Sequence, residues 1–304
     1  MMKTWHVIIN PLALGKKRMK LWKKVLNDME EQDCNFKEYY TQKPKDAIDL
    51  TKEIIENGAK NIIALGGDGT LNELVNGIMI SNIDKSEIIL AHIPMGTGND
   101  WAKTHKISRK KDAILKIFQN GTIVNHDVGL VQSLENKFDQ RYFINIAGMG
   151  FDAAIIKKVF ETKRLKFGNG LVYIKTLLSI LSKHRASEVE IEIDNENIKT
   201  NMYSIAAGIC KYNGNGMMQV PMANFNDGLI DLVVINDITK AEIISQIPNL
   251  FSGKHVKHRK ISTYKTKELS VKSKDIIYTE VEGELLGSGD VKISVCNEQL
   301  KVLV

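Results

Sequence analysis

The segment LGGDGTLNE, at residues 65–73, carries the residue types that bind phosphate groups. An apolar run precedes it and an amphipathic pattern follows, which predicts a strand, a turn and a helix in that order. The three glycines let the backbone approach a ligand without interference from Cβ atoms. The start of the helix presents free N–H groups and a partial positive charge, so the turn is a candidate phosphate site. Thr70 and Glu73 have the spacing of a capping box, which would fix where this helix begins.

Asp68 stands inside this turn, where a carboxylate is a poor neighbour for a phosphate. A cation between the two groups removes the conflict, and Mg²⁺, bound directly or through water, is the simplest choice. The segment IPMGTGND, at residues 93–100, repeats the arrangement one strand later. Two neighbouring parallel strands that end in this way form a crevice at their carboxyl ends, where α/β folds bind ligands. The alternative for Asp68 is a structural role within a tight turn.

Other motifs give weaker indications. No GxxxxGK[ST] segment occurs, so a P-loop is excluded. The segment GMGFDA, at residues 148–153, matches the pattern GxGxxA, but it lies in a half that we predict to be antiparallel, and we interpret it as a packing turn. His255 and His258 would share a helical face, but the sequence offers no third ligand nearby. We therefore expect a surface location for this pair rather than a zinc site.

The predicted elements change character near residue 125. Before it, continuous apolar runs at 5–9, 61–65 and 87–93 alternate with amphipathic helical patterns, which predicts a parallel sheet covered by helices on both faces. After it, strictly alternating runs such as 188–193 predict antiparallel strands. The further strands that we expect in this half lie at 142–147, 203–209, 229–235, 268–272 and 291–295, and the two helices at 151–162 and 171–183.

The composition is that of a globular chain. Of its 304 residues 43% are hydrophobic and 26% are charged, which argues against a disordered or fibrous protein. The three cysteines, Cys34, Cys210 and Cys296, are widely spaced and odd in number, so a disulfide framework is excluded and a reducing compartment is favoured. We find no signal-like or membrane-spanning apolar stretch and expect a cytoplasmic protein.

The formal net charge is +6, and basic residues concentrate in three clusters, at 16–24, 103–111 and 254–260. The first cluster lies at the beginning of a predicted helix, where the helix dipole disfavours positive charge. An external anion would compensate, either the phosphates of ATP or the headgroups of an anionic membrane surface. The alternative is an exposed helix with no partner. Nucleic acid is not an expected partner, because no aromatic-rich sheet face accompanies the clusters.

Together, GGDGTLNE and PMGTGND resemble the diacylglycerol kinase catalytic-domain family, which includes soluble bacterial lipid kinases, sphingosine kinases and ceramide kinases. The resemblance covers essentially the whole chain. It extends to the segments Asn10-Pro11, Thr41, Asn145–Ala153, Asp227–Asp231 and Glu282–Glu284. It implies an α/β Rossmann-like domain of the NAD kinase and phosphofructokinase kind at residues 1–127 and a mostly antiparallel β-sandwich domain at 128–295. A last strand at 296–304 would return to the first domain.

The resemblance also implies roles for individual residues. ATP and Mg²⁺ would bind between the domains, and Glu284 would accept the proton of the substrate hydroxyl. Asp68 would act with it in the catalytic site, and Asp68 and Asp100 would belong to the surrounding acidic network. The residues implied to line the nucleotide are Asn10, Thr41, Gly66, Gly67, Asp68, Gly69, Thr70, Leu71, Asn72 and Thr97.

A magnesium ion is implied at Asp227, with the backbone carbonyl groups of Asn224 and Leu229. The chain departs from the family pattern at two positions. Leu14 stands where the family tends to have glycine, which affects the path of the first loop. Glu282 replaces the usual aspartate, so its carboxylate lies one methylene farther from the backbone.

These features predict an ATP- and Mg²⁺-dependent lipid kinase that transfers the γ-phosphate to a diacylglycerol-like hydroxyl, with the protein bound peripherally at the inner face of the membrane. One alternative is an NAD kinase-like enzyme with a soluble substrate, since such enzymes share the GGDG-type turn. Another is a catalytically silent protein that binds nucleotide or lipid. The sequence leaves the identity of the lipid open, and also the oligomeric state, a homodimer included.

Overall fold

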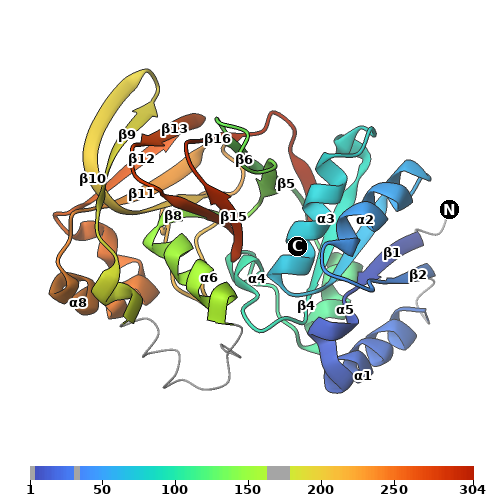
Figure 1. The fold of residues 1–304 in the computed structure, drawn as a ribbon. Coiled ribbons are helices and arrows are strands. Elements are labelled where there is room, and N and C mark those ends of the chain that lie inside the picture. The colour runs from blue at the N-terminus through green and yellow to red at the C-terminus, as the bar shows by residue number, and fades with distance from the viewer. Residues whose placement is uncertain (1–3, 31–34, 163–178) are drawn as a thin grey trace.

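The computed structural model describes residues 4–30, 35–162 and 179–304, which form two lobes side by side (Figure 1). The elements of the amino-terminal lobe are β1 (Thr4–Ile9), α1 (Pro11–Glu30), β2 (Asn35–Tyr40), α2 (Asp46–Glu56), β3 (Asn61–Gly66), α3 (Asp68–Met79), η1 (Lys85–Glu87), β4 (Ile89–Pro94), α4 (Asp100–Thr104), α5 (Lys111–Asn120), β5 (Ile123–His126) and, from the end of the chain, β17 (Leu300–Leu303). They form a six-stranded sheet in the order β2-β1-β3-β4-β17-β5, in which only β5 runs antiparallel to its neighbour.

Neighbouring residues on each strand of this sheet point to opposite faces. On β1 and β3, Ile8 and Ile62 pack with α2 and α3, whereas Val7 and Ile63 pack with α1 and α5. All four side chains are completely buried, as expected for continuous apolar runs that are covered on both sides. The predicted parallel sheet with helices on both faces is therefore confirmed.

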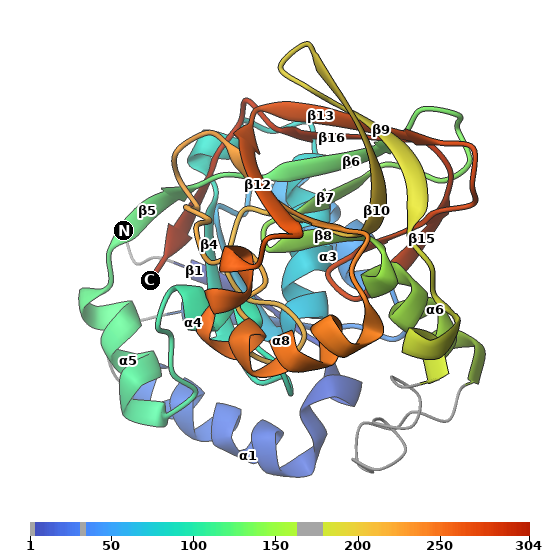
Figure 2. The ribbon, with the colours of Figure 1, turned by 90° about the vertical axis from the view of Figure 1, so that its left-hand side faces the viewer.

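The carboxy-terminal lobe is built on one large antiparallel sheet. Its elements are β6 (Gly129–Ser133), β7 (Arg141–Phe143), β8 (Ile146–Gly150), α6 (Phe151–Thr162), β9 (Ser187–Ile193), β10 (Glu196–Gly208), β11 (Ile230–Asn236), α8 (Lys240–Ser252), η2 (Lys254–Lys257), β12 (Ile261–Thr266), β13 (Glu268–Ser273), β14 (Tyr278–Val281), β15 (Glu284–Ser288) and β16 (Val291–Val295). The order is β15-β14-β8-β10-β9-β13-β16-β6-β7, with β11 pairing to β10 and β12. Val131 of β6 and Val281 of β14 share one core although they lie near opposite ends of this path, because the sheet curls around that core (Figure 2).

Some predicted elements differ from the structure. The strand predicted at 142–147 divides into β7 and β8, because the N–H groups of Ile144 and Asn145 donate to the Glu282 carboxylate (2.7 and 2.8 Å) instead of to a strand. Helix α8 occupies a segment for which we predict no element. Helix α6 coincides with the predicted helix at 151–162. Most of the helix predicted at 171–183 lies outside the described residues. The part that is described, residues 179–183, is helical.

Two weaker motifs have different outcomes. Gly150, at φ 78°, joins β8 to α6, and a Cβ atom there would lie 2.7 Å from the backbone oxygen of Tyr203, so the packing turn predicted for GMGFDA is confirmed. The surface location predicted for His255 is wrong, because its side chain is buried. Nε2 of His255 lies 3.1 Å from the backbone oxygen of Gln219, and this hydrogen bond anchors the imidazole inside the protein.

The two lobes are tied together by side-chain contacts and by the path of the chain. Asn76 of α3 bonds to both backbone groups of Tyr142 on β7: its amide donates to the carbonyl oxygen, and its own oxygen accepts from the N–H, both at 3.0 Å. The chain leaves the first sheet after β5 and returns to it with β17, which lies between β4 and β5. None of the described helices combines the length and the apolar character needed to cross a bilayer.

Candidate active site

The parallel strands β1 to β4 end side by side along one rim of the first sheet. Asn10 follows β1, Thr41 follows β2, Gly67 follows β3 and Met95 follows β4. The N–H of Thr41 donates to the carbonyl oxygen of Ile9 (3.0 Å), so neighbouring strand ends stay in register where the loops begin. The two glycine loops singled out in the sequence therefore start next to each other at this rim.

The two glycine loops touch through their backbones. A Cβ on Gly96 would lie 2.4 Å from the Cα of Gly67, so a side chain there would force the loops apart. Asn99, at φ 54°, closes the second loop by accepting from the N–H of Gly96 (2.8 Å) and donating to its carbonyl oxygen (3.0 Å). Gly69 and Thr97 are exposed at the surface of these loops. A ligand can therefore approach both loops at once.

The predicted capping box is wrong. Helix α3 begins at Asp68 with Gly67 as its N-cap, and no side chain caps it. The Glu73 carboxylate instead accepts from the N–H groups of Lys45 (3.2 Å) and Ala47 (3.3 Å) at the start of α2. Since an N-terminal side chain does not occupy them, the first N–H groups of α3 are available to an anion.

The carboxylates of Asp68 and Asp100 flank the second loop. A Cβ on Gly98 would lie 3.2 Å from Oδ2 of Asp68 and 3.5 Å from Oδ2 of Asp100. Oδ1 of Asp68 accepts from the N–H of Trp101 (3.2 Å) at the start of α4. Asp100 binds the N–H of Asn215 in the other lobe (2.7 Å) and also Lys103. One oxygen of Asp68 thus fixes the loop, and the other remains beside the rim.

Some residues implied to line the nucleotide make contacts within the protein. The side chain of Leu71 is fully buried in the core of the first lobe. Asn72 is also buried, and its amide donates to the carbonyl oxygen of Tyr142 (2.9 Å). Oδ1 of Asn10 accepts from the N–H of Leu12 (3.2 Å) at the start of α1. Leu71 and Asn72 can therefore offer a nucleotide only their backbone.

The second lobe brings the turn between β14 and β15 to the same region. Oε2 of Glu284 lies 3.1 Å from Nη2 of Arg141 on β7, and the Arg141 side chain is only 8% exposed. Arg141 is not among the site residues predicted from the sequence. In the sequence it is only a single basic residue at the edge of an apolar run. Glu282 stands at φ 49° in the turn, and one of its oxygens accepts both N–H groups that divide β7 from β8. The longer side chain of Glu282 is thus used to hold the adjacent backbone.

The electrostatics show that acids from the two lobes face one another. Burial, with a smaller contribution from the negative charge of Asp68, raises the pKa of Glu282 to about 8, although the Arg141 guanidinium opposes the shift. Burial likewise raises the pKa of Glu73, with a contribution from Glu284 in the other lobe. Charges influence one another in this way only at short range. Carboxylates from both lobes and the Arg141 guanidinium therefore meet beside the glycine loops.

A cavity of about 580 Å³ opens between α1 and the second glycine loop, a size that is typical of small-ligand sites. The residues that line it are Lys17, Arg18, Lys20, Leu21, Lys24, Met95 and Arg109. Gly15, at φ 64°, interrupts α1 just before these residues, and Leu14 is buried in the core. The glycine that the family tends to have at position 14 is thus found one residue later, at Gly15. The basic cluster of α1 faces the cavity beside the rim.

The site implied for magnesium at Asp227 is taken by a lysine. Nζ of Lys265 lies 2.7 Å from Oδ2 of Asp227 and 3.6 Å from Oδ2 of Asp231, and Oδ1 of Asp227 accepts from the N–H of Leu229 (3.2 Å). The hydrogen bond with Asp227 raises the pKa of Lys265. Both oxygens of Asp227 are therefore engaged, and a magnesium ion fits here only if Lys265 moves.

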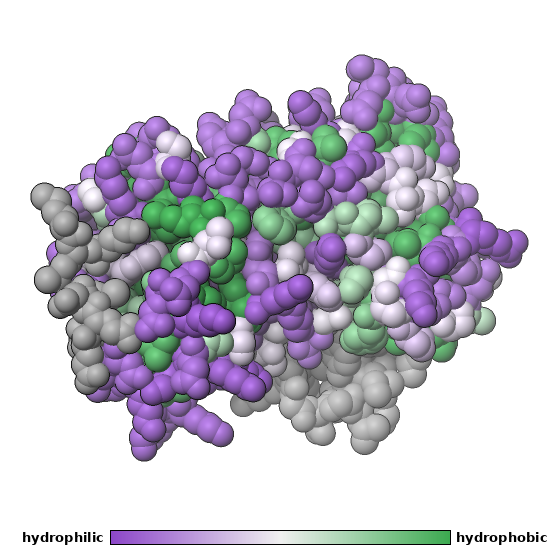
Figure 3. All heavy atoms as spheres, turned by 180° about the vertical axis from the view of Figure 1, so that it is seen from behind, coloured by the Kyte–Doolittle hydropathy of each residue, from purple (hydrophilic) through white to green (hydrophobic). Residues whose placement is uncertain are grey.

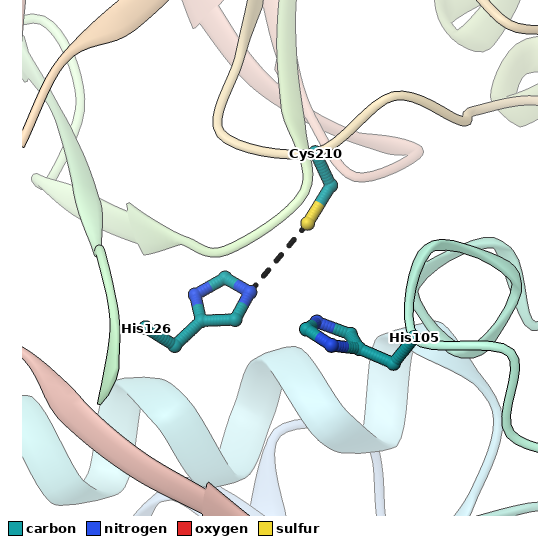
Figure 4. A group of neighbouring side chains, drawn as sticks. All are labelled: His105, His126 and Cys210. Carbon is teal, nitrogen blue, oxygen red and sulfur yellow. Dashed lines mark hydrogen bonds between the residues drawn. The ribbon is translucent and has the colours of Figure 1, made fainter. Parts of the chain in front are cut away.

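Three side chains outside the predicted site meet in a buried cluster (Figure 4). The ligand atoms of His105, His126 and Cys210 all lie within 4.8 Å of one another, a grouping that soft metals favour. Nε2 of His126 accepts from the indole N–H of Trp101 (3.0 Å), and its Nδ1–H donates to the backbone oxygen of Asp127 (2.7 Å). Because Trp101 already uses the nitrogen that would face a metal, we interpret the cluster as a neutral packing contact between the lobes.

Comparison with known proteins places this arrangement in a class. The pattern of the diacylglycerol kinase catalytic domain matches residues 4–131, and that of the YegS C-terminal NAD kinase beta sandwich-like domain matches residues 145–304. The crystal structure of a diacylglycerol kinase from Bacillus anthracis str. Sterne has the same fold, with a TM-score of 0.71 at 18% sequence identity over 99% of this chain and 96% of that chain. Fold and site together define a two-lobed protein of the NAD kinase-like kind.

Similar sequences narrow the class to a family. A diacylglycerol kinase of Staphylococcus saprophyticus subsp. saprophyticus is 30% identical, over 94% of this chain and 90% of its own length. The protein of Bacillus subtilis (strain 168) with the name "Putative lipid kinase YtlR" is 26% identical, over 99% of both chains. The chain belongs to the diacylglycerol kinase catalytic-domain family.

Removal of the Lys265 ammonium should open the Asp227 site to magnesium. We expect the Lys265→Ala variant to have a lower Tm than the wild type and to regain stability when Mg²⁺ is added, because a ligand that binds only the folded state stabilises it. The wild type should show no such gain. The measurement is thermal unfolding at increasing Mg²⁺ concentration. The control is Lys267→Ala, which changes the next lysine along the chain, an exposed residue. An equal gain for the wild type and Lys265→Ala would contradict the prediction.

The His126 cluster should make the protein sensitive to acid. Burial lowers the pKa of His126 to about 4. Between about pH 6.5 and about pH 4 this residue therefore binds a proton in the unfolded chain but not in the folded chain. The free energy of unfolding should therefore fall as the pH drops from 6.5 to about 4, by about 3 kcal/mol for this residue. His126→Gln retains an acceptor for Trp101 and should lose this part of the dependence. Urea unfolding of both proteins across this pH range tests it, and identical pH profiles would refute it.

Proposed function

We propose that this chain is an ATP- and Mg²⁺-dependent lipid kinase that transfers the γ-phosphate of ATP to the hydroxyl group of a diacylglycerol-like lipid at a membrane surface. The observation that carries the proposal is the meeting of two chemistries at one place. The glycine loops and the uncapped start of α3 offer N–H groups to a phosphate chain. Glu284, from the other lobe, is paired with the guanidinium of Arg141 and lies close enough to α3 for its charge to raise the pKa of Glu73. Family membership supports the same reading.

In this proposal the phosphate chain of ATP lies along the rim of the first sheet. The N–H groups at the start of α3 would bind phosphate oxygens, and the basic side chains of the α1 cavity would balance their charge. Asp68 has one carboxylate oxygen directed toward this region and would hold Mg²⁺ there. When bound, the ion would reduce the negative charge on the transferring phosphate.

Glu284 would supply the base of the reaction. It would accept the proton of the lipid hydroxyl while that oxygen forms a bond to the γ-phosphorus and the bond to the leaving ADP breaks. Arg141, which is held in β7 and almost fully buried, would keep the carboxylate directed at the rim. Glu282 would not act as a base, since its carboxylate is bound by the N–H groups of Ile144 and Asn145.

The substrate class is testable directly. Labelled ATP and Mg²⁺ are incubated with a whole-lipid extract, and in parallel with NAD and sugar phosphates, and the products are identified by mass. A phosphorylated glycerolipid is the expected product. Label on the soluble compounds alone would establish an NAD kinase-like enzyme instead, and no label in any mixture would establish a silent binding protein.

Substitution of the proposed base should separate chemistry from binding. We expect Glu284→Gln to lower kcat by about 10²–10⁴-fold, because the amide cannot accept the hydroxyl proton. ATP binding, measured by calorimetry, should persist, since the rim loops are unchanged. Glu188→Gln, an exposed glutamate of the same lobe, is the matched control and should keep full activity. Unchanged kcat in Glu284→Gln would remove this residue from the mechanism.

A further inference from the structure

Helix α8 is firmly attached to the second lobe along one side. A capping box between Thr239 and Glu242 fixes its start, and Gly253 in the left-handed conformation ends it. Ile243 packs against Tyr203 in a small apolar cluster. Near the other end, the carbonyl oxygen of Leu250 accepts from a backbone N–H of the neighbouring loop (2.7 Å). The helix is therefore held in one orientation, and the side that it turns to solvent is a fixed feature of the surface.

The solvent side of α8 is apolar. Ile244, Ile247 and Phe251 are 48%, 47% and 54% exposed, and Pro248 between them is exposed as well. Their spacing of three, four and seven residues places them on one face of the helix, which we call the outer face of α8. Among the described residues nine large hydrophobic side chains are exposed, and three of them gather here. An apolar face of this kind on a protein surface marks a contact with a partner.

Positive charge surrounds this face. Between residues 239 and 260 the chain has four lysines and one arginine against one acid, Glu242. Glu242 pairs with Arg259 and Lys260, whereas Lys240, Lys254 and Lys257 are exposed beside the helix. Seen from behind, the side of the molecule that carries α8 shows hydrophobic patches next to strongly hydrophilic side chains (Figure 3). The basic cluster noted at 254–260 in the sequence thus directly follows an exposed apolar helix.

Helix α8 lies on the second lobe and helix α1 on the first, and both appear in the lower part of the molecule in Figures 1 and 2.

We infer that the outer face of α8 docks on an anionic phospholipid bilayer, with Ile244, Ile247, Pro248 and Phe251 among the acyl chains and the flanking lysines at the headgroups. A helix with one apolar face and a basic border binds membranes in this way. A second copy of the chain fits less well, because a twofold contact would bring the same lysines together. The inference rests on the proposed function for its choice of a lipid partner, and it adds the surface that finds the membrane.

The experiment compares vesicle binding of two double variants. Ile247→Glu with Phe251→Glu places charge on the outer face of α8, and we expect it to lower binding to phosphatidylglycerol-containing vesicles by about tenfold or more. Lys254→Gln with Lys257→Gln should weaken binding at low salt and have little effect at high salt. Ile276→Glu, at an isoleucine that is 76% exposed and lies outside α8, is the control and should bind like the wild type. Circular dichroism verifies that all variants are folded.

The readouts keep the docking surface and the kinase activity apart. Phosphorylation is measured on vesicles and on a short-chain diacylglycerol that is monomeric in water, and the Ile247→Glu, Phe251→Glu variant should lose only the vesicle activity. A protein that binds vesicles through α8 but phosphorylates no lipid would refute the proposed function and support the docking surface. Vesicle binding equal to the wild type would overturn the inference. The inference would also be overturned if light scattering showed that the wild type is a dimer and the variant a monomer, while both bind vesicles equally.

Discussion

The structure depends on how negative charge is held between the two lobes. Buried carboxylates are unfavourable unless hydrogen bonds or cations compensate them. Here backbone N–H groups bind Glu282, Glu73 caps a neighbouring helix, and Arg141 binds Glu284. Each compensation also fixes the position of a carboxylate relative to the glycine loops. The same contacts that make the acids tolerable therefore set the geometry in which a phosphate chain and a hydroxyl group would meet.

The turn before β11 is held by a cation beside Asp227. A divalent ion at Asp227 would organise the turn before β11 through oxygen ligands. In this structure the ammonium of Lys265 makes those contacts and also reaches Asp231, whose pKa is raised by burial. A lysine cannot be removed by a chelator, so the turn keeps its shape independently of the ion supply.

Local patterns in the sequence predict most of the fold. The continuous apolar run at 61–65 becomes a strand buried on both faces, and the glycines that follow it form the expected loop. The capping box fails because Glu73 finds closer N–H groups at the start of α2, a contact that only the tertiary structure creates. The pair of Arg141 and Glu284 is separated by 143 residues, and no periodicity connects them. Side-chain partners of this kind are decided by packing, and sequence patterns do not contain them.

The placement of β17 has a consequence for how the protein is made. This strand, at residues 300–303, lies between β4 and the edge strand β5 in a sheet whose other strands all precede residue 127. During synthesis the first sheet has a gap between β4 and β5 until residues 300–303 have left the ribosome. The amino-terminal lobe is therefore completed only after the lobe that follows it in sequence has emerged. A nascent chain that stalls early would present two unpaired strand edges, which are sites where other chains can attach.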